Sequence, residues 1–449
     1  MKILFIHQNF PAQYRHLARH LGGLADHQVV FITQLQEGQL PGVHKIVYKP
    51  HRAVSPQIHH YLRESEGAVL NAQAVAQVAT SLRKSGFVPD VILGHNGWGE
   101  IWYLKDVFPE TPLIGYFEFY YQMTGTDVGF DPLYPVTPDT APRIRTKNLG
   151  NVLALNTVDL GQCPTEWQKS LYPQRYHSML HVIHEGIDST VAKPDRAARL
   201  EIAEAGIQVH AGEEIVTYVA RNLEPCRGFP SFMRSLPKIL AARPRARVLV
   251  VGGDGVSYSA PLPAGETFRD RILAELGDSV DVARVHFLGR IPYDSFIHLL
   301  QVSRVHVYLT YPFVLSWSML EAMSAGCLVV GSRTSPVEEV IRHGANGLLA
   351  DFFAPDQIAD YVIEALGDPR AFASVRDNAR QTVIDRYDLK MVCLPAKVRL
   401  LNTLVPRERR VAIAAPCPPA IARQSEGVTP ISRNSPDSPP GIVAAAVAS

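Results

Sequence analysis

The chain has 449 residues, 46% of them hydrophobic, and a formal net charge of +1 at pH 7. That length exceeds one ordinary domain, so the sequence predicts two domains, each with a sizeable apolar core. A charge balance this close to neutral argues against a dedicated nucleic-acid-binding protein, so nucleic acid is not among the expected partners.

The first half of the chain alternates short apolar runs with helical patterns. A strand is predicted at residues 2–6, and a helix at residues 12–21 places Tyr14, Leu17 and Leu21 on one face. Further strands are predicted at residues 29–33, 91–93, 113–117, 152–155 and 180–183. Strands that alternate with helices indicate a doubly wound α/β domain. We expect this domain to span residues 1–188.

The same alternation returns in the second half. Strands are predicted at residues 215–220, 247–251, 305–309 and 327–331. They predict a second α/β domain over residues 189–388, followed by a closing helix at residues 389–404. From residue 405 to residue 449 the chain is rich in proline and small residues and lacks aromatic ones. Such a composition predicts a disordered tail.

The segment 311–326 carries the most informative pattern in the chain. It follows a predicted strand and opens a helix, for which Gly326 is a natural stop. Ser318 and Glu321 stand three residues apart, which is the spacing of a capping box. The free backbone N–H groups at such a helix start favour an anion, typically a phosphate. Ligands of open parallel sheets bind at the carboxyl ends of the strands, where this turn lies.

This segment resembles the donor-site signature of the retaining, GT-B-fold glycosyltransferases of family 4. Residues 320–323, Leu-Glu-Ala-Met, match the end of that signature. The resemblance implies that Glu321 binds the ribose hydroxyls of a nucleotide. A helix-capping carboxylate without a ligand explains the same residue, and both interpretations stay open. The first Glu of the signature, which normally touches the donor sugar, falls on Phe313 in this chain.

Two arginines follow the predicted strand at residues 215–220. Arg221 stands at its end and Arg227 six residues later, where the family has an Arg and a Lys that hold the donor diphosphate. The resemblance therefore implies this role for both, although solvated surface arginines are the alternative. Arg can grip a phosphate through two parallel hydrogen bonds. The resemblance further implies that the main chain around Arg290 and Ile291 contacts the nucleotide base, although a surface residue before a turn explains Arg290 nearly as well. It implies donor contacts at the helix start too: Leu315, Ser316 and Ser318.

Polar side chains also follow strands of the first domain. Gln8 and Asn9 come directly after the first strand and His95 after a later one, at ends that face the cleft in this fold. These groups suit hydrogen bonding to an acceptor sugar, while capped turns and a structural histidine explain them equally well. Glu118 stands where many family members place a His near the donor sugar. We favour a ligand contact for it over a structural salt bridge, because Glu is rarely buried without a partner.

The resemblance covers residues 1–404 and implies an α/β protein of the GT-B fold. Two Rossmann-like doubly wound domains would face each other across a cleft, the acceptor domain first and the nucleotide-sugar donor domain second. The implied activity is retaining transfer of a sugar from a nucleotide-diphosphate sugar to a hydroxyl of a glycan or lipid-linked acceptor. Arg221 and Arg227 would stabilise the departing diphosphate, with Glu118 as a third catalytic residue. No metal or other cofactor is implied.

Two other functions stay open. A sugar-nucleotide 2-epimerase of the same fold would also bind the donor but would need no acceptor. A non-catalytic GT-B protein would bind a partner enzyme or a glycan, and Phe313 in place of the first Glu favours it. The retained charges of Arg221, Arg227 and Glu321 argue against that function.

The sequence also bears on cellular location. The five cysteines are scattered, with no CxxC pair or His/Cys metal spacing, which indicates a reducing cytoplasm. No apolar run approaches the roughly 20 residues of a membrane span, and residues 2–6 are too short for a signal peptide. We therefore expect a cytoplasmic protein, and contact with the inner face of a membrane stays open.

Overall fold

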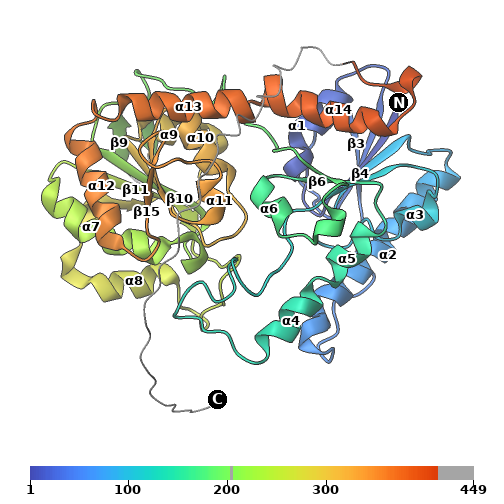
Figure 1. The fold of residues 1–449 in the computed structure, drawn as a ribbon, viewed down its shortest axis with the longest axis horizontal. Coiled ribbons are helices and arrows are strands. Elements are labelled where there is room, and N and C mark those ends of the chain that lie inside the picture. The colour runs from blue at the N-terminus through green and yellow to red at the C-terminus, as the bar shows by residue number, and fades with distance from the viewer. Residues whose placement is uncertain (203–205, 413–449) are drawn as a thin grey trace, which may run out of the picture. The chain divides into compact units, whose positions relative to one another are not determined.

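The fold is described from a computed structural model, in which residues 1–202 and 206–412 are placed (Figure 1). Two parallel sheets organise these residues, one in each half of the chain, and helices pack on both. The predicted α/β class with two doubly wound domains is therefore confirmed. A short antiparallel hairpin, β8 (Arg199–Ile202) and β9 (Ile207–His210), lies between the two sheets in the sequence.

The first sheet has seven parallel strands in the order β3-β2-β1-β4-β5-β6-β7. Their bounds are β1 Lys2–Ile6, β2 Gln28–Thr33, β3 Val43–Val47, β4 Val91–His95, β5 Leu113–Tyr116, β6 Leu160–Cys163 and β7 Leu180–Val182. The central strands β1 and β4 are apolar and buried, as expected for strands covered on both faces. The strand order reverses between them, and ligands bind beside the carboxyl ends of such a strand pair.

The second sheet repeats this plan with six parallel strands in the order β12-β11-β10-β13-β14-β15. Their bounds are β10 Ile215–Asn222, β11 Arg247–Gly253, β12 Val285–Phe287, β13 Val305–Tyr308, β14 Leu328–Ser332 and β15 Leu348–Ala350. Here the order reverses between β10 and β13. Arg221 lies near the end of β10, and the segments that follow β10 and β13 carry Arg227 and the helix start that the sequence singled out.

The helices pack their apolar faces on the two sheets. Those of the first half are α1 Arg15–Gly22, α2 Arg63–Lys84, α3 Leu104–Val107, α4 Thr140–Lys147, α5 Leu149–Leu155 and α6 Glu166–Ser170. Those of the second half are α7 Phe229–Ala242, α8 Phe268–Leu276, α9 Tyr293–Val302, α10 Trp317–Ala325, α11 Ser335–Glu338, α12 Pro355–Gly367, α13 Ala373–Tyr387 and α14 Leu394–Leu404. Helix α10 is buried along most of its length, so its start is held firmly.

One predicted strand is wrong. Residues 152–155 belong to helix α5, and the sheet position falls to β6 instead. In α5 the side chains of Ala154 and Leu155 are buried while Val152 and Leu153 are exposed, which is the one-sided burial of a surface helix. A short apolar run does not distinguish a strand from such a helix by itself.

The C-terminal end of the described chain returns to the first domain. A π-helical turn at Leu389–Cys393 leads into α14, which lies beside α1 (Figure 1). Val398 and Leu401 of α14 join the apolar core on that side of the first sheet. Pro395 occupies the first turn of α14, where its missing N–H is not needed, so it opens the helix instead of kinking it.

The boundary predicted after Leu404 is too early. Val405 and Val411 are each only 3% exposed and pack into the same core, and Asn402 pairs with the backbone of Val411 through two hydrogen bonds. Composition alone cannot reveal two isolated valines that pack. Residues 413–449, the rest of the predicted tail, lie outside the described residues.

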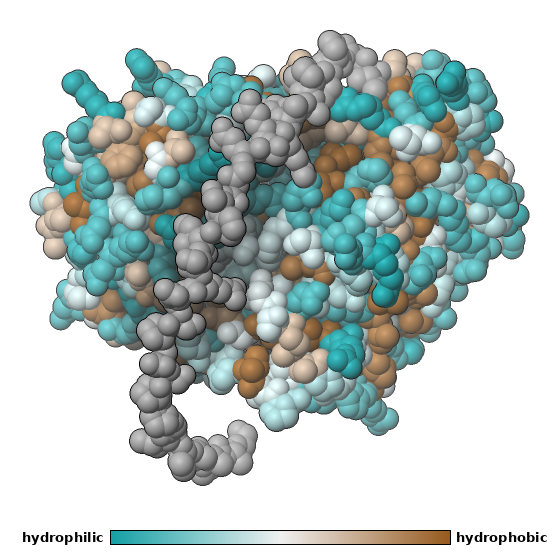
Figure 2. Space-filling model, in the orientation of Figure 1, coloured by the Kyte–Doolittle hydropathy of each residue, from teal (hydrophilic) through white to brown (hydrophobic). Residues whose placement is uncertain are grey.

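The face shown in Figure 2 mixes hydrophilic and hydrophobic residues over both halves of the chain. Among the residues that the structure describes, no helix is long and apolar enough to cross a bilayer.

Candidate functional site

Two adjoining cavities lie at the carboxyl ends of the central strands. The smaller has a volume of about 350 Å³ and the larger about 1090 Å³. Residues from both halves of the chain line both cavities: Gln13, Glu118, Arg221, Tyr258, Val314 and Trp317. The cavities therefore sit where the sheet topology predicts a ligand.

Arg227 brings a buried cation to the smaller cavity. It ends the short turn after β10 and is 8% exposed. One guanidinium nitrogen, Nη1, donates to Thr310 Oγ1 and to the Val314 carbonyl oxygen, both at 2.9 Å. Among the described residues no carboxylate forms an ion pair with it. A buried, unpaired charge costs several kcal/mol, so this cavity favours an anionic ligand.

Arg221 adds a second cation at the end of β10. Its side chain is exposed and lines both cavities. Arg221 thus reaches the smaller cavity from the end of β10, and Arg227 reaches it from the turn that follows this strand. Leu315 and Ser316 line the same cavity from the segment that opens α10.

The start of α10 differs from the predicted capping box. The N-cap is Ser316, whose Oγ accepts a hydrogen bond from the Ser318 backbone N–H at 3.4 Å. Ser318 is already inside the helix and is buried. Ser316 also donates its backbone N–H to the Tyr308 hydroxyl at 2.7 Å. The helix start nevertheless lies at the smaller cavity, where its free N–H groups suit an anion.

Glu321 lies one turn farther along α10 and lines neither cavity. It is 7% exposed, and its Oε1 accepts a hydrogen bond from the Tyr293 hydroxyl at 2.9 Å. Burial raises the pKa of this carboxyl, which hydrogen bonding from Tyr293 partly offsets. Glu321 is therefore not a capping residue, and its second oxygen has no protein partner among the described residues.

The two residues of the loop predicted to bind a nucleotide base, Arg290 and Ile291, lie in different surroundings. Arg290 is exposed and lines the larger cavity, beside Asn222 and Ser257. Ile291 lines neither cavity and packs against the apolar core of the second domain. Of these two residues, only Arg290 can reach a ligand in the cavity through its side chain.

Phe313, where the resemblance places a Glu, forms part of an aromatic wall. Its ring lies 4.7 Å from that of Phe119 and 4.9 Å from that of Tyr258, centroid to centroid. The Arg227 guanidinium lies over the Tyr258 ring at 5.1 Å and over the Phe313 ring at 5.8 Å. This wall packs the arginine into place, and it supplies no carboxylate to the ligand.

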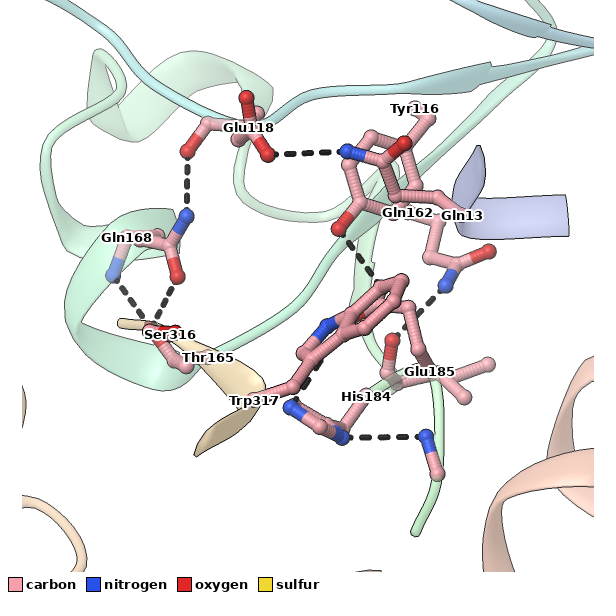
Figure 3. Close-up of polar contacts among 12 residues, drawn as sticks. Gln13, Tyr116, Glu118, Gln162, Thr165, Gln168, His184, Glu185, Ser316 and Trp317 are labelled. Atoms are coloured by element: carbon pink, nitrogen blue, oxygen red, sulfur yellow. Dashed lines mark hydrogen bonds and ion pairs between the residues drawn. The ribbon is translucent and has the colours of Figure 1, made fainter. Parts of the chain in front are cut away.

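Glu118 stands at the junction of the two cavities, and its side chain is 30% exposed. Its Oε1 accepts from Gln13 Nε2 at 3.1 Å, and Gln168 holds its backbone carbonyl (Figure 3). Burial and the negative charge of Glu185 raise the pKa of Glu118 to about 7, against the effects of Gln13 and Arg227. Near pH 7 the carboxyl therefore exists in both protonation states.

This raised pKa predicts the pH dependence of stability. The folded protein holds the Glu118 proton up to about pH 7, while the unfolded chain loses it near its ordinary pKa of about 4.3. Stability is therefore lost as the pH rises through that window. Glu118→Gln removes this loss, so we expect its melting temperature to exceed that of the wild type at pH 8 and to match it at pH 4. Melting curves across this range measure the difference, and a constant offset at every pH would contradict the raised pKa.

The residues predicted on the acceptor side meet in the larger cavity. Gln8, Asn9 and His95 all line it. His95 is 1% exposed and packs between the rings of Trp98 and Tyr116, at centroid distances of 4.7 and 5.0 Å. An aromatic and amide-rich wall of this kind suits the faces and hydroxyls of a sugar.

Glu185 organises a polar network that the sequence did not predict. Its two carboxylate oxygens accept from the Tyr116 hydroxyl at 2.6 Å and from Trp317 Nε1 at 3.0 Å (Figure 3). Burial would raise its pKa, but the charges of His184 and Lys397 and these hydrogen bonds hold it below its usual value. The only signals in the sequence are a Glu at a strand end and a Lys on an apolar helix face.

These features define a two-domain α/β protein with a cation-lined site between its two sheets. Residues 25–192 match the family described as "Glycosyl transferase family 4 group", and residues 203–382 match "Glycosyl transferases group 1". The chain belongs to the group 1 glycosyltransferases.

Among curated relatives, N-acetyl-alpha-D-glucosaminyl L-malate synthase of Bacillus anthracis is 31% identical over 23% of this chain and 27% of its own length. Phosphatidyl-myo-inositol mannosyltransferase of Mycolicibacterium smegmatis is 25% identical over 51% of this chain and 61% of its own length. The aligned segments thus span less than two thirds of these relatives.

Solved structures match over more of the chain. Sucrose-phosphate synthase of Thermosynechococcus elongatus aligns with a TM-score of 0.67 and 19% identity, over 90% of this chain and 99% of that one. HepE of Anabaena in complex with UDP-glucose aligns with a TM-score of 0.63 and 17% identity, over 90% and 100%. At this identity the likeness concerns the fold alone, and it is the GT-B fold.

Proposed function

We propose that this protein transfers a sugar from a nucleotide-diphosphate sugar to a hydroxyl of a glycan or lipid-linked acceptor, with retention at the anomeric carbon. The observation that carries the proposal is Arg227, a buried cation that has no carboxylate partner among the described residues and faces a cavity at the start of α10. A diphosphate supplies the missing negative charge. The mannosyltransferase and N-acetylglucosaminyl-malate synthase names among the relatives support a sugar-nucleotide donor, and so does the UDP-glucose bound by HepE.

The chemistry follows from charge. As the bond between the anomeric carbon and the phosphate oxygen breaks, negative charge grows on the departing diphosphate. Arg227, Arg221 and the N–H groups at the start of α10 stabilise that charge. The acceptor oxygen bonds to the anomeric carbon on the same face, and its proton passes to an oxygen of the departing phosphate. Glu118 lies beside this path and contacts the sugar.

The proposal is tested by binding and by product analysis. Thermal-shift and calorimetric titrations with UDP, GDP, UDP-glucose and GDP-mannose identify the nucleotide, because a ligand that binds the folded state raises the melting temperature. NMR spectroscopy of the reacted nucleotide sugar then separates transfer or hydrolysis, which free the nucleoside diphosphate, from epimerisation, which inverts one sugar carbon without changing the mass. A protein that binds none of these ligands, at concentrations up to the millimolar range, would contradict the proposed function.

Glu321 is either a ligand of the nucleotide ribose or a structural partner of Tyr293, and one substitution distinguishes the two roles. Its second oxygen, which accepts no hydrogen bond from the described residues, suits a ribose hydroxyl, and we expect Glu321→Gln to weaken nucleoside-diphosphate binding about tenfold, a loss of about 1.4 kcal/mol. The melting temperature of the unliganded protein should change little, because Gln can still accept from Tyr293. Calorimetric titration of both proteins decides, and an unchanged dissociation constant would leave Glu321 a structural partner of Tyr293.

A further inference from the structure

His95 presents a buried hydrogen-bond donor for which the described residues offer no acceptor within hydrogen-bond distance. Its Nδ1 accepts the Gly97 backbone N–H at 2.8 Å, so the ring proton of the neutral imidazole is on Nε2. Burial and the neighbouring His7 hold the pKa of His95 well below its usual value, which keeps the ring neutral. Within the described part of the chain, Nε2 has no hydrogen-bond partner.

A carboxylate oxygen faces this donor at too long a distance for a direct bond. Glu118 Oε2 lies 3.9 Å from His95 Nε2, and because the imidazole is neutral the contact is not an ion pair. Both residues line the larger cavity. Two atoms 3.9 Å apart can each reach one shared oxygen at an ordinary hydrogen-bond length of about 2.8 Å.

The surrounding contacts fix both groups in this arrangement. His7 Nδ1 accepts the Asn9 backbone N–H, so His7 Nε2 donates to Gln13 Oε1 at 2.7 Å. The amide nitrogen of Gln13 must then face Glu118, where it occupies Oε1 (Figure 3). Glu118 Oε2 is left toward His95, and the rings packed on His95 hold the imidazole in place.

We propose that the gap between His95 Nε2 and Glu118 Oε2 binds one hydroxyl group of a sugar substrate. When Glu118 is ionised, the bound group must accept from an N–H and donate to a carboxylate at once, which a hydroxyl does and an ionised phosphate, carboxylate or ether oxygen does not. When Glu118 is protonated, a hydroxyl can accept from both groups, so a hydroxyl suits both protonation states. The inference rests on the proposed sugar transfer and deepens it. Glu118 also lines the cavity that Arg227 enters, so the hydroxyl belongs either to the donor sugar or to the acceptor.

Two substitutions remove the two halves of this site. His95→Phe keeps an aromatic side chain and deletes the Nε2 donor, together with the Nδ1 acceptor of the Gly97 N–H. In Glu118→Gln the amide oxygen stays toward Gln13, so its NH₂ group faces His95 and places two donors opposite each other. His306→Phe is the matched control, because His306 is fully buried with an unpartnered Nε2 but lines neither cavity.

The probes are UDP and GDP, which lack the sugar, and UDP-glucose and GDP-mannose, which carry it. We expect His95→Phe and Glu118→Gln each to keep the affinity for the nucleoside diphosphate within about twofold. If each variant loses affinity about tenfold for the nucleotide sugar but not for the nucleoside diphosphate, the hydroxyl belongs to the donor. The double variant should then lose less binding free energy than the two single losses added together, because both residues bind the same hydroxyl. The second result is unchanged nucleotide-sugar affinity with about tenfold slower hydrolysis, measured as release of nucleoside diphosphate. In hydrolysis a water molecule takes the place of the reacting acceptor hydroxyl, so this result assigns the gap to the acceptor.

Other results overturn the inference. If both variants retain wild-type affinity and turnover, or if His306→Phe loses as much as His95→Phe, the gap binds no substrate hydroxyl. An equal loss of affinity for UDP or GDP would show general damage to the donor site and would also overturn it. A wild-type protein that binds no nucleotide at all would instead overturn the proposed function, and the two failures are therefore distinct.

Discussion

Arg227→Ala is expected to lower turnover at saturating donor by about a hundredfold or more, the usual cost of removing one group that stabilises charge in a transition state. The guanidinium is buried, pairs with no carboxylate of the described chain and is fixed by Thr310 Oγ1 and the Val314 carbonyl, so no reorganisation is needed when the diphosphate departs. Most of the loss should therefore fall on the rate of the chemical step. Release of nucleoside diphosphate, measured over a range of donor concentrations, separates this loss from weaker binding.

Three further variants make the result specific. Arg227→Lys keeps the charge but cannot form the forked contacts, so we expect partial activity. Arg221→Ala removes the exposed cation of the same site and should also slow turnover by about a hundredfold. Arg380→Ala is the control, because Arg380 is held by backbone carbonyls and lines neither cavity. Near wild-type turnover of both Arg227→Ala and Arg221→Ala would show that neither holds the diphosphate.

The parts of the fold that the sequence predicted have strong local signals. Apolar, β-branched runs such as residues 215–220 and 305–309 became the central strands β10 and β13, and their ends marked the site. The strand predicted at residues 152–155 was wrong because an apolar run this short shows neither the helical nor the strand period. The strand β6, Leu-Gly-Gln-Cys, lacks β-branched residues and gave no signal.

The candidate site was predictable only where it follows a strand end or helix start. Arg221, Arg227 and Ser316 lie there, and the structure brings them to one cavity. The contacts of Glu185 with Trp317 and Lys397 join residues 132 and 212 positions apart, and no local pattern encodes them. For the same reason the sequence could not show that Tyr293 reaches Glu321, or that His95 faces Glu118.

A truncation that removes residues 389–449 is expected to cause aggregation or a large fall in melting temperature. Helix α14 contributes Val398 and Leu401 to a core that also contains Ile3 and Leu17 of the first domain. Fully burying each such side chain stabilises the fold by about 1.5–3 kcal/mol, and whole domains are stable by only about 5–15 kcal/mol. The deletion also removes Lys397, whose Nζ lies 3.5 Å from the backbone carbonyl oxygen of Glu185. The charge of Lys397 also lowers the pKa of the buried Glu185 side chain.

Shorter truncations test how much of the stability comes from the residues after α14. A chain that ends after residue 412 keeps every described contact and should match the full-length protein in melting temperature and turnover. A chain that ends after Leu404 loses the buried Val405 and Val411 and the ion pair of Arg409 with Asp90, so we expect a moderate fall in melting temperature without aggregation. If the cut after residue 412 were as damaging as the cut after Leu404, residues 413–449 would contribute to the core. If the 389–449 deletion stayed soluble with an unchanged melting temperature, α14 would be dispensable and the described packing would carry little of the stability.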